Sequence, residues 1–385
     1  MTTWRLLTDD GAGAAEGLAL DEALMGGVGH RASRSVPALR LYTYASHAAL
    51  VGRYQTLDAE IALAECALTG TAVSRRPTGG GAIVMGSGQL GVALVLPAPA
   101  TTPRALIAEL GHGVVDGLAR LGVTAAFGGK NDLLVDGRKI AGLGLYRDGN
   151  GALLFHASVL RDLDVAFMLR VLRIPAAKLA DQAVAAVEER VTTVHREAGR
   201  EIDTDTLRAA VAEGFAARFG VALVPSDPDE AERAAAVGLV ASRYAHPTWL
   251  RENGAQPDGT GSAIFRSSDG TIRCFVAAQG SLVKSVLFTG DFNTVPAGLR
   301  SLEAALRWRR LDEPTVAELV TQTHNAYEDD LGWRRDADVV AAVLGAGAKA
   351  VDRAAAQPVR PAGSCYFPEP TASPEPITDP ARSRT

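Results

Sequence analysis

The sequence predicts an α/β fold with a mixed or antiparallel sheet, followed by a smaller α+β domain. Asp136-Gly137 stands between two apolar runs, as in a two-residue β-hairpin turn, and a third apolar run follows at 153–160. Strands that succeed one another through hairpins belong to antiparallel or mixed sheets rather than to doubly wound ones. The chain of 385 residues exceeds what one core usually organises, and the turn residues at 225–228 mark the expected boundary.

The other elements follow from apolar spacing and turn residues. Strands are expected at 38–51, 71–74, 89–96, 272–277 and 282–289. Helices are expected at 9–28, 58–68, 103–122, 164–172, 181–189, 205–219, 229–243, 296–308, 314–327 and 336–344. We therefore expect a first domain at 1–226, a second at 227–350, and a disordered tail rich in Pro, Ala and Ser at 351–385.

Composition excludes several classes of function. A formal net charge of −5 argues against broad nucleic-acid binding by charge. Three cysteines, Cys66, Cys274 and Cys365, lie far apart without a CxxC pair, which favours a reduced protein without a cysteine metal site. The first ten residues carry no leader pattern, and no apolar run reaches the ~18 residues of a membrane span. We expect a cytoplasmic protein with neither a nucleic-acid nor a membrane partner.

Two arginines followed by three glycines form the most informative stretch. Arg75 and Arg76 precede Gly79, Gly80 and Gly81, and an apolar run follows. Glycines let main-chain N–H groups approach a ligand closely, and consecutive amides form an anion-binding concavity. Arginine adds directional hydrogen bonds to phosphate or carboxylate. The alternative is a tight loop beside a strand that carries a surface arginine pair.

Three further positions are candidates for chemistry. Lys139 follows the hairpin turn among small residues, so its compact charge suits a phosphate, unless it is an exposed edge-strand lysine. Asp132 and its neighbour Asn131 form either a turn cap or part of a Mg²⁺ site. His156 lies within a predicted strand, where a lone histidine is more often structural than catalytic.

Taken together, these blocks resemble the lipoate–protein ligase A family. Residues 75–83 resemble its R-R-x-[ST]-G-G-G-A-V motif, and residues 129–133 its G-R-N-D-L, with Lys130 replacing Arg. Residues 138–142 are similar to its [RK]-K-[IV]-[SA]-G, 155–160 to its H-H-G-T-L-L, and 190–194 to its S-R-V-T-N-L. Similarity to the family's accessory domain continues at Trp249, Gly254 and Pro257, and then from Gly280 to Asp291. The resemblance implies a catalytic domain of the biotin/lipoate ligase type.

The resemblance also implies an activity. Family members use ATP and Mg²⁺ to activate lipoate as lipoyl-AMP, and then transfer the lipoyl group to a lysine of an acceptor domain. The acceptors are acyltransferase subunits of 2-oxoacid dehydrogenases, the H protein of glycine cleavage, or similar domains. By this resemblance, the protein is an ATP-dependent lipoate–protein ligase.

The matching positions receive the family's roles. Lys139 is the expected catalytic residue, because it would stabilise charge in both half-reactions. The implied ATP contacts are Arg76, Gly81, Ala82, Ile83, Val84 and Lys139. The implied contacts to lipoate or lipoyl-AMP are Arg75, Gly79, Gly80, Asn131, Asp132, Lys139, Ala141, Gly142 and His156. Asp132 is the expected Mg²⁺ ligand, and the strand at 90–96 with Leu143 would wall an acyl tunnel.

Departures from the family pattern leave alternatives open. Met85-Gly86 replaces the usual His-Asp, and Phe155 replaces the first His of H-H-G. Residues 86–90 look more like the H-G-P-G-Q-L of octanoyltransferases, yet those enzymes use a cysteine as acyl carrier and none stands between Cys66 and Cys274. The alternatives are a lipoyl or octanoyl transferase that uses a preformed donor, and a non-catalytic homologue that binds an acyl group or acceptor domain. A biotin ligase is weaker, since the G-R-G-R-x-G loop is absent.

Overall fold

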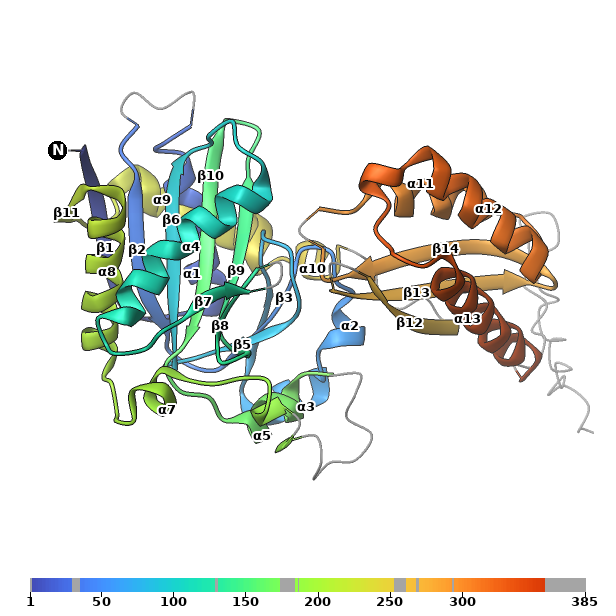
Figure 1. The fold of residues 1–385 in the computed structure, drawn as a ribbon, viewed down its shortest axis with the longest axis horizontal. Coiled ribbons are helices and arrows are strands. Elements are labelled where there is room, and N and C mark those ends of the chain that lie inside the picture. Colours follow the sequence, from blue (N-terminus) through green and yellow to red (C-terminus); the bar gives the residue numbers. More distant parts are fainter. Residues whose placement is uncertain are drawn as a thin grey trace, which may run out of the picture.

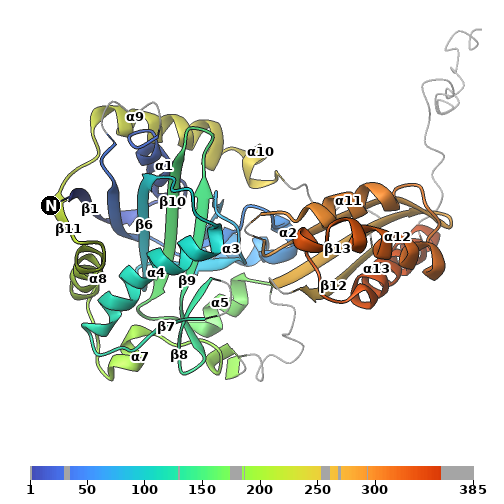
Figure 2. The same cartoon turned by 45° about the horizontal axis from the view of Figure 1, so that its top comes forward.

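The protein folds around two separate sheets, each with its own helices (Figure 1). The computed structural model describes residues 2–29, 35–128, 131–173, 184–185, 187–252, 261–267, 270–292 and 294–356. The first unit comprises the described residues up to 252, and the second, C-terminal unit comprises those from 261 onward. The two units lie end to end in two views related by a 45° turn (Figures 1 and 2).

The main sheet of the first unit has eight strands in the order β11-β1-β2-β6-β10-β9-β8-β7. In chain order these strands are β1 (Thr2–Ala12), β2 (Ala38–Tyr44), β6 (Gln89–Pro97), β7 (Ala126–Gly128), β8 (Asp132–Val135), β9 (Arg138–Arg147), β10 (Ala152–Leu160) and β11 (Val221–Pro225). β1 pairs in parallel with β2 and β11, and the other pairings are antiparallel. The mixed sheet predicted from the hairpin is confirmed.

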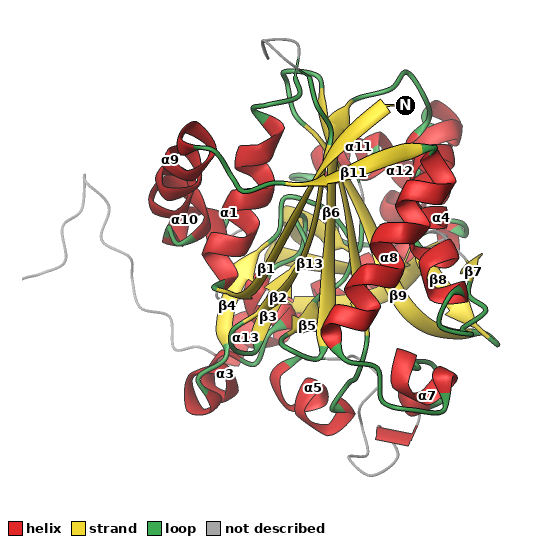
Figure 3. Ribbon diagram, turned by 90° about the vertical axis from the view of Figure 1, so that its left-hand side faces the viewer, coloured by secondary structure: helices red, strands yellow, loops and turns green. Residues whose placement is uncertain are grey.

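Helices cover both faces of this sheet (Figure 3). One face carries α4 (Pro103–Ala119) and α8 (Thr204–Phe219), and the other carries α1 (Ala14–Met25) and α9 (Glu230–Leu239). Because strand side chains alternate between faces, each of these layers has its own buried cluster. The cluster on the α1 side also borders the functional pocket described below.

A small three-stranded sheet stands beside the α1 face. Its strands are β3 (Ala48–Val51), β4 (Ala72–Arg75) and β5 (Ile83–Met85), in the order β4-β3-β5. The short helices of this region are α2 (Leu57–Glu60), α3 (Leu63–Thr69), α5 (Val165–Val171) and α7 (Val194–Ala198). The glycine-rich stretch is the loop that joins β4 to β5.

The C-terminal unit packs three helices on a three-stranded antiparallel sheet. The strands are β12 (Gly261–Ser267), β13 (Gly270–Gln279) and β14 (Leu282–Gly290), and the helices are α11 (Ala297–Leu306), α12 (Glu313–Ala326) and α13 (Asp336–Ala356), with the short 3₁₀ helix η2 (Glu328–Asp330) between the last two. They enclose a third hydrophobic cluster, to which the first unit contributes only the partly buried Tyr54. Within the described residues, no helix is both long and apolar enough to cross a bilayer.

Several predicted elements differ from the structure. Residues 2–12 form β1 instead of leading into a helix, because they pair with both β2 and β11. The expected strand at 38–51 divides between the two sheets as β2 and β3, and the expected helix at 58–68 is broken between α2 and α3. β12 was not predicted, and α13 continues to Ala356. The predicted helix at 181–189 lies partly outside the described residues, as does the predicted tail from 357 onward.

The packing of the first unit continues beyond the predicted boundary at 226. α9 is followed by the π-helix η1 (Val240–Tyr244) and by α10 (Pro247–Leu250). Tyr244 and Trp249 belong to the buried cluster on the α1 face. We therefore propose a division after Leu250, since a boundary at 226 would cut through this hydrophobic core.

Candidate functional site

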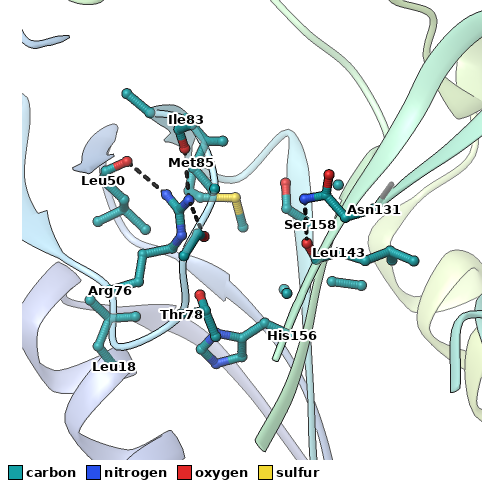
Figure 4. Close-up of a pocket in the computed structure, with 18 of the residues that line it drawn as sticks. Leu18, Leu50, Arg76, Thr78, Ile83, Met85, Asn131, Leu143, His156 and Ser158 are labelled. Carbon is teal, nitrogen blue, oxygen red and sulfur yellow. Dashed lines mark hydrogen bonds between the residues drawn. The ribbon is translucent and has the colours of Figure 1, made fainter. Parts of the chain in front are cut away.

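A pocket lies between the α1 face of the main sheet and the small sheet (Figure 4). Its cavity measures about 110 Å³. The polar lining side chains are Arg76, Thr78, Asn131, Lys139, His156 and Ser158, and the larger apolar and aromatic ones are Leu18, Tyr42, Tyr44, Leu50, Ile83, Met85 and Leu143. A mostly apolar cavity with a few convergent polar groups is the usual form of a small-molecule site.

Glycines on strands of the main sheet leave space for this pocket, and we call this side its floor. Gly91 on β6, Ser158 on β10 and Gly142 on β9 lie side by side in the sheet register. A Cβ on Gly91 would lie 2.8 Å from the Tyr42 ring, and one on Gly142 would lie 3.1 Å from Lys139 Nζ. Side chains at these positions would therefore fill the space. Glycine within a strand often marks such a place, where a ligand or another backbone approaches closely.

Arg76 holds the glycine loop in shape. Its Nη1 donates to Leu50 O at 2.9 Å, and its Nη2 donates to Gly79 O at 3.0 Å and Gly81 O at 2.7 Å (Figure 4). The side chain lines the pocket although it is almost fully buried, and burial lowers the pKa of Arg76 to about 10. Gly80 has φ = +94°, which favours glycine. The loop is thus fixed around a buried positive charge.

Arg75 lies elsewhere, contrary to its predicted contact with substrate. It is fully buried and absent from the pocket lining. Its guanidinium donates to two groups of main-chain carbonyls. One group, Gly52, Arg53 and Gln55, follows β3, and the other, Trp249 and Leu250, belongs to α10. Arg75 therefore joins α10 to the segment that follows β3.

Lys139 is positioned by three chain segments. Its Nζ lies 2.7 Å from Asp132 Oδ1, and both side chains are about one-third exposed, at 35%. The main-chain N–H of Lys139 donates to Arg190 O, and its main-chain carbonyl accepts from Thr192 N, both at 2.8 Å. Asn131 Nδ2 donates to Leu143 O at 2.9 Å, which fixes the hairpin beside the pocket. A lysine held at a pocket mouth can stabilise an anion or a developing negative charge.

Most predicted site residues meet in this pocket. Those that line it are Arg76, Gly79, Gly80, Gly81, Ala82, Ile83, Asn131, Lys139, Gly142 and His156. Asp132 stands behind Lys139 as its ion-pair partner. Val84 and Ala141 are buried in other hydrophobic clusters and do not line the pocket, so direct substrate contact is not supported for either.

A buried charge network behind His156 was not predicted. His156 Nε2 lies 2.9 Å from Asp21 Oδ2, which also accepts from Tyr42 Oη at 2.8 Å, and Arg40 Nη1 donates to Asp21 Oδ1 at 2.6 Å. Burial alone would raise the pKa of Asp21, but Arg40 and His156 outweigh it, so the pKa is lowered. The ionised carboxylate therefore orients the imidazole at the pocket. An aspartate on the buried face of a helix was the only sequence sign of this network.

The C-terminal unit also reaches the glycine loop, which the sequence did not predict. Gly80 N donates to Phe292 O at 2.9 Å, and a Cβ on Gly81 would lie 3.5 Å from Asp291 Oδ1. More than two hundred residues separate these partners along the chain, so no local pattern reveals the contact.

The donor set around Lys139 fits magnesium only in a limited way. In the described part of the chain, no group of three or more His, Cys, Asp or Glu side chains converges as a metal site. Mg²⁺ is often held by one or two carboxylates together with substrate phosphates and water. Asp132 suits that arrangement as a single carboxylate 2.7 Å from Lys139, which itself lines the pocket.

No described cysteine lines the pocket. Cys66 is buried in the cluster around the small sheet, where burial raises its pKa, and Cys274 is buried in the C-terminal sheet. Residues 174–178, the stretch that matches the cysteine region of octanoyltransferases, lie outside the described residues and contain no cysteine in the sequence. Cys365 also lies outside the described part.

Known proteins share both the sequence pattern and the fold. The family model of the lipoyl protein ligase A/B catalytic domain matches residues 13–216. The octanoyltransferase LipM of Symbiobacterium thermophilum is 30% identical over 273 residues, which are 64% of this chain and 98% of LipM.

Two solved structures extend the comparison. A bi-partite lipoate protein ligase from Thermoplasma acidophilum, analysed with its E2 lipoyl domain, has a TM-score of 0.60 at 26% identity, over 65% of this chain and 97% of its own. The lipoate complex of P. falciparum LipL1 has a TM-score of 0.62 at 15% identity, over 85% and 99% respectively, and shows a shared fold. The chain therefore belongs to the lipoyl protein ligase A/B family of acyl ligases and transferases, as its motifs predicted.

Proposed function

We propose that this protein is an ATP-dependent lipoate–protein ligase. The observation that carries the proposal is the composition of one pocket: a lysine at its mouth, a glycine loop built around a buried arginine, apolar walls, and no thiol among its lining residues. The lysine and the loop suit an acyl phosphate anhydride, while the missing thiol argues against a thioester carried by the enzyme.

The proposed first step joins lipoate to AMP. The lipoate carboxylate attacks the α-phosphorus of ATP, an oxygen–phosphorus bond forms, and pyrophosphate leaves. The Lys139 ammonium neutralises charge on the carboxylate and then on the phosphate, with loop N–H groups as further donors. Bound Mg²⁺, with Asp132 as its protein ligand, would neutralise phosphate charge.

The second step transfers the acyl group. The neutral amine of an acceptor lysine attacks the lipoyl carbonyl carbon, an amide bond forms, and AMP leaves with the bonding electron pair. The proton that the amine nitrogen loses passes to solvent. Lys139 again faces the negative charge that develops on the carbonyl and phosphate oxygens. The acyl chain would lie over the glycine floor against Leu18, Leu50 and Met85.

Coverage by the relatives does not separate a ligase from a transferase. The match to LipM covers 64% of this chain and the match to the Thermoplasma ligase covers 65%, so each leaves about a third of the chain unmatched. We propose lipoyl acceptor domains of 2-oxoacid dehydrogenase acyltransferase subunits and the glycine cleavage H protein as partners; the Thermoplasma ligase was analysed with such an E2 domain.

An octanoyl or lipoyl transferase that uses a preformed donor is the second candidate. The identity with LipM and the replacement of the family histidine by Met85 favour it. The replacement of the family's first histidine by Phe155 supports a transferase less than the sequence alone suggested. Its side chain points away from the pocket and packs near Phe215, with ring centroids 6.4 Å apart. Only Met85 therefore changes the chemistry of the pocket itself.

The test is lipoate-dependent pyrophosphate release from ATP by the purified protein with Mg²⁺. We expect release that Lys139→Ala lowers by about 100-fold or more, as for loss of a transition-state donor. The variant's melting curve should match that of the wild type, because Lys139 is one-third exposed. A folded wild type that releases no pyrophosphate, yet transfers octanoyl groups from an acyl-carrier thioester, would instead establish the transferase.

A further inference from the structure

The C-terminal unit carries opposite charges at the two ends of helix α11. The exposed segment Arg307-Trp308-Arg309 directly follows the helix, and we call it the basic end. At the start of the helix, Asp330 Oδ2 accepts from Ala297 N at 3.0 Å. The exposed segment Tyr327-Glu328-Asp329-Asp330 therefore lies there, and we call it the acidic end. Because α11 has 10 residues, the two ends are about 15 Å apart.

Trp308, at the basic end, is unusual in both its backbone and its exposure. Its φ is +62°, in the left-handed region that favours glycine and strains a bulky residue. Main-chain hydrogen bonds hold it there, since Trp308 N donates to Val283 O at 2.7 Å and Val283 N donates to Arg309 O at 2.8 Å. The side chain is nevertheless 50% exposed. Glycine would serve the fold better at this position, so the exposed indole points to a contact with another molecule.

The charges at both ends are available to a partner. Within the described part of the chain, no carboxylate pairs with Arg307 or Arg309, whereas Arg310 pairs with Asp312 at 3.0 Å. No described basic side chain pairs with Glu328 or Asp329 either. The next exposed cation along the chain from the acidic end, Arg334, offsets only one of its three carboxylates. Each end therefore keeps its net charge.

The face of α11 between the two ends allows another helix to approach closely. α11 lies along the outer edge of the C-terminal unit in two views (Figures 1 and 2). Its buried residues are Gly298, Leu299, Leu302 and Leu306. The opposite face presents three small residues and one arginine: Ala297, Arg300, Ser301 and Ala304. Small side chains at a helix contact shorten the distance between the helix axes.

We propose that this face is the interface of a homodimer, in which α11 packs antiparallel to α11 of a second copy. A two-fold axis at the middle of the helix sets each basic end against the acidic end of the other copy, so the same contact forms twice. Trp308 and Tyr327, which is 37% exposed, are the aromatic anchors. An unrelated acidic protein would use the basic end alone, whereas a second copy uses both ends and the face between them.

The dimer is expected to be weak. One helix and its two ends form an interface at the small end of the range for specific complexes. Arg300 also lies close to Arg300 of the other copy across the axis, and like charges repel. We therefore expect association in the micromolar range, and strong weakening by salt, because exposed ion pairs are screened.

Sedimentation velocity of the full chain from about 1 to about 100 µM tests the dimer. Wild type should pass from monomer to dimer over this range. Arg309→Glu and Asp329→Arg should each raise the dimer Kd by about 10-fold or more, since each sets like charges together. The double variant restores opposite charges at both contacts and should recover most of the affinity. Arg266→Glu is the matched control, because Arg266 is exposed on β12 in the same unit, and it should leave the Kd unchanged.

Trp308→Gly separates association from folding. Glycine relieves the strain at φ = +62°, so the melting temperature should stay the same or rise while the dimer is lost. A lower melting temperature would show that the indole supports the fold, and would overturn the argument from its exposure. A wild type that stays monomeric over the whole range would overturn the proposal. A dimer that tolerates Arg309→Glu and Trp308→Gly, or a double variant that fails to recover, would also overturn it.

Discussion

Replacing Arg75 would show whether this residue supports the fold or contacts the substrate. The sequence motif assigns Arg75 to the substrate, whereas its guanidinium donates to five main-chain carbonyls at 2.7–3.2 Å and is fully buried. Arg75→Ala leaves these carbonyls without their donor, at about 1–3 kcal/mol for each that stays dry. If water entering the vacated space serves three of the five, the two that remain cost about 2–6 kcal/mol, and we take about 4 kcal/mol as the expected loss.

Such a loss is a large part of the stability of an ordinary domain, about 5–15 kcal/mol. Urea unfolding followed by circular dichroism should therefore show a much lower midpoint for Arg75→Ala, with Arg75→Lys between the two because lysine offers three donors. Below the unfolding transition, binding of lipoate by Arg75→Ala should stay within about two-fold of the wild type. An unchanged midpoint combined with lost lipoate binding would refute the structural assignment and restore the predicted substrate contact.

Two further predictions concern the pocket floor and the network behind it. Gly91→Ala places a Cβ 2.8 Å from the Tyr42 ring, which Asp21 and Arg40 hold in place, so the melting temperature should fall by the equivalent of about 1–3 kcal/mol. Gly149→Ala, where no atom lies within 4 Å of the added Cβ, is the control, and equal melting of the two variants would contradict the packing argument. The pKa of Asp21 is lowered, so its ionised form stabilises the fold above its unfolded pKa near 3.8, and this stabilisation is lost as pH falls through the lower native pKa. Asp21→Asn should thus be clearly less stable than wild type at about pH 7, with a smaller gap at about pH 3, and a gap independent of pH would show that the charge of Asp21 does not matter.

Local chemistry explains which parts of the fold were predictable. Asp136 and Gly137 have φ of +49° and +78°, as the turn prediction requires, because that turn depends on two adjacent residues. β1 was missed because its partners, β2 and β11, begin 36 and 219 residues after it. The expected helix began at Asp9, but tertiary pairing of the strand overrides that local preference.

Dependence on tertiary pairing also limits how much of the site can be predicted from the sequence. The sequence singled out the Arg75-Arg76 pair but could not tell which side chain faces the ligand. Consecutive side chains of an extended segment point to opposite sides, and only the pairing of β4 with β3 decides which side is the pocket. Ala141 and Gly142 divide in the same way between the core and the pocket. Asp291 was beyond reach because only the docking of the second unit brings it to the loop.

The reciprocal bonds between β4 and α10 limit how this protein can be recombined with its relatives. Trp249 Nε1 donates to Arg75 O at 2.8 Å, and Arg75 returns hydrogen bonds to the carbonyls of Trp249 and Leu250. A chimera joined at 226 would set a foreign α10 against Arg75 and disturb the strand that leads into the glycine loop. A chimera joined after Leu250 would take β4, the glycine loop and α10 from the same parent, so the hydrogen bonds of Arg75 would be kept. C-terminal units should therefore be exchangeable at the second junction and not at the first.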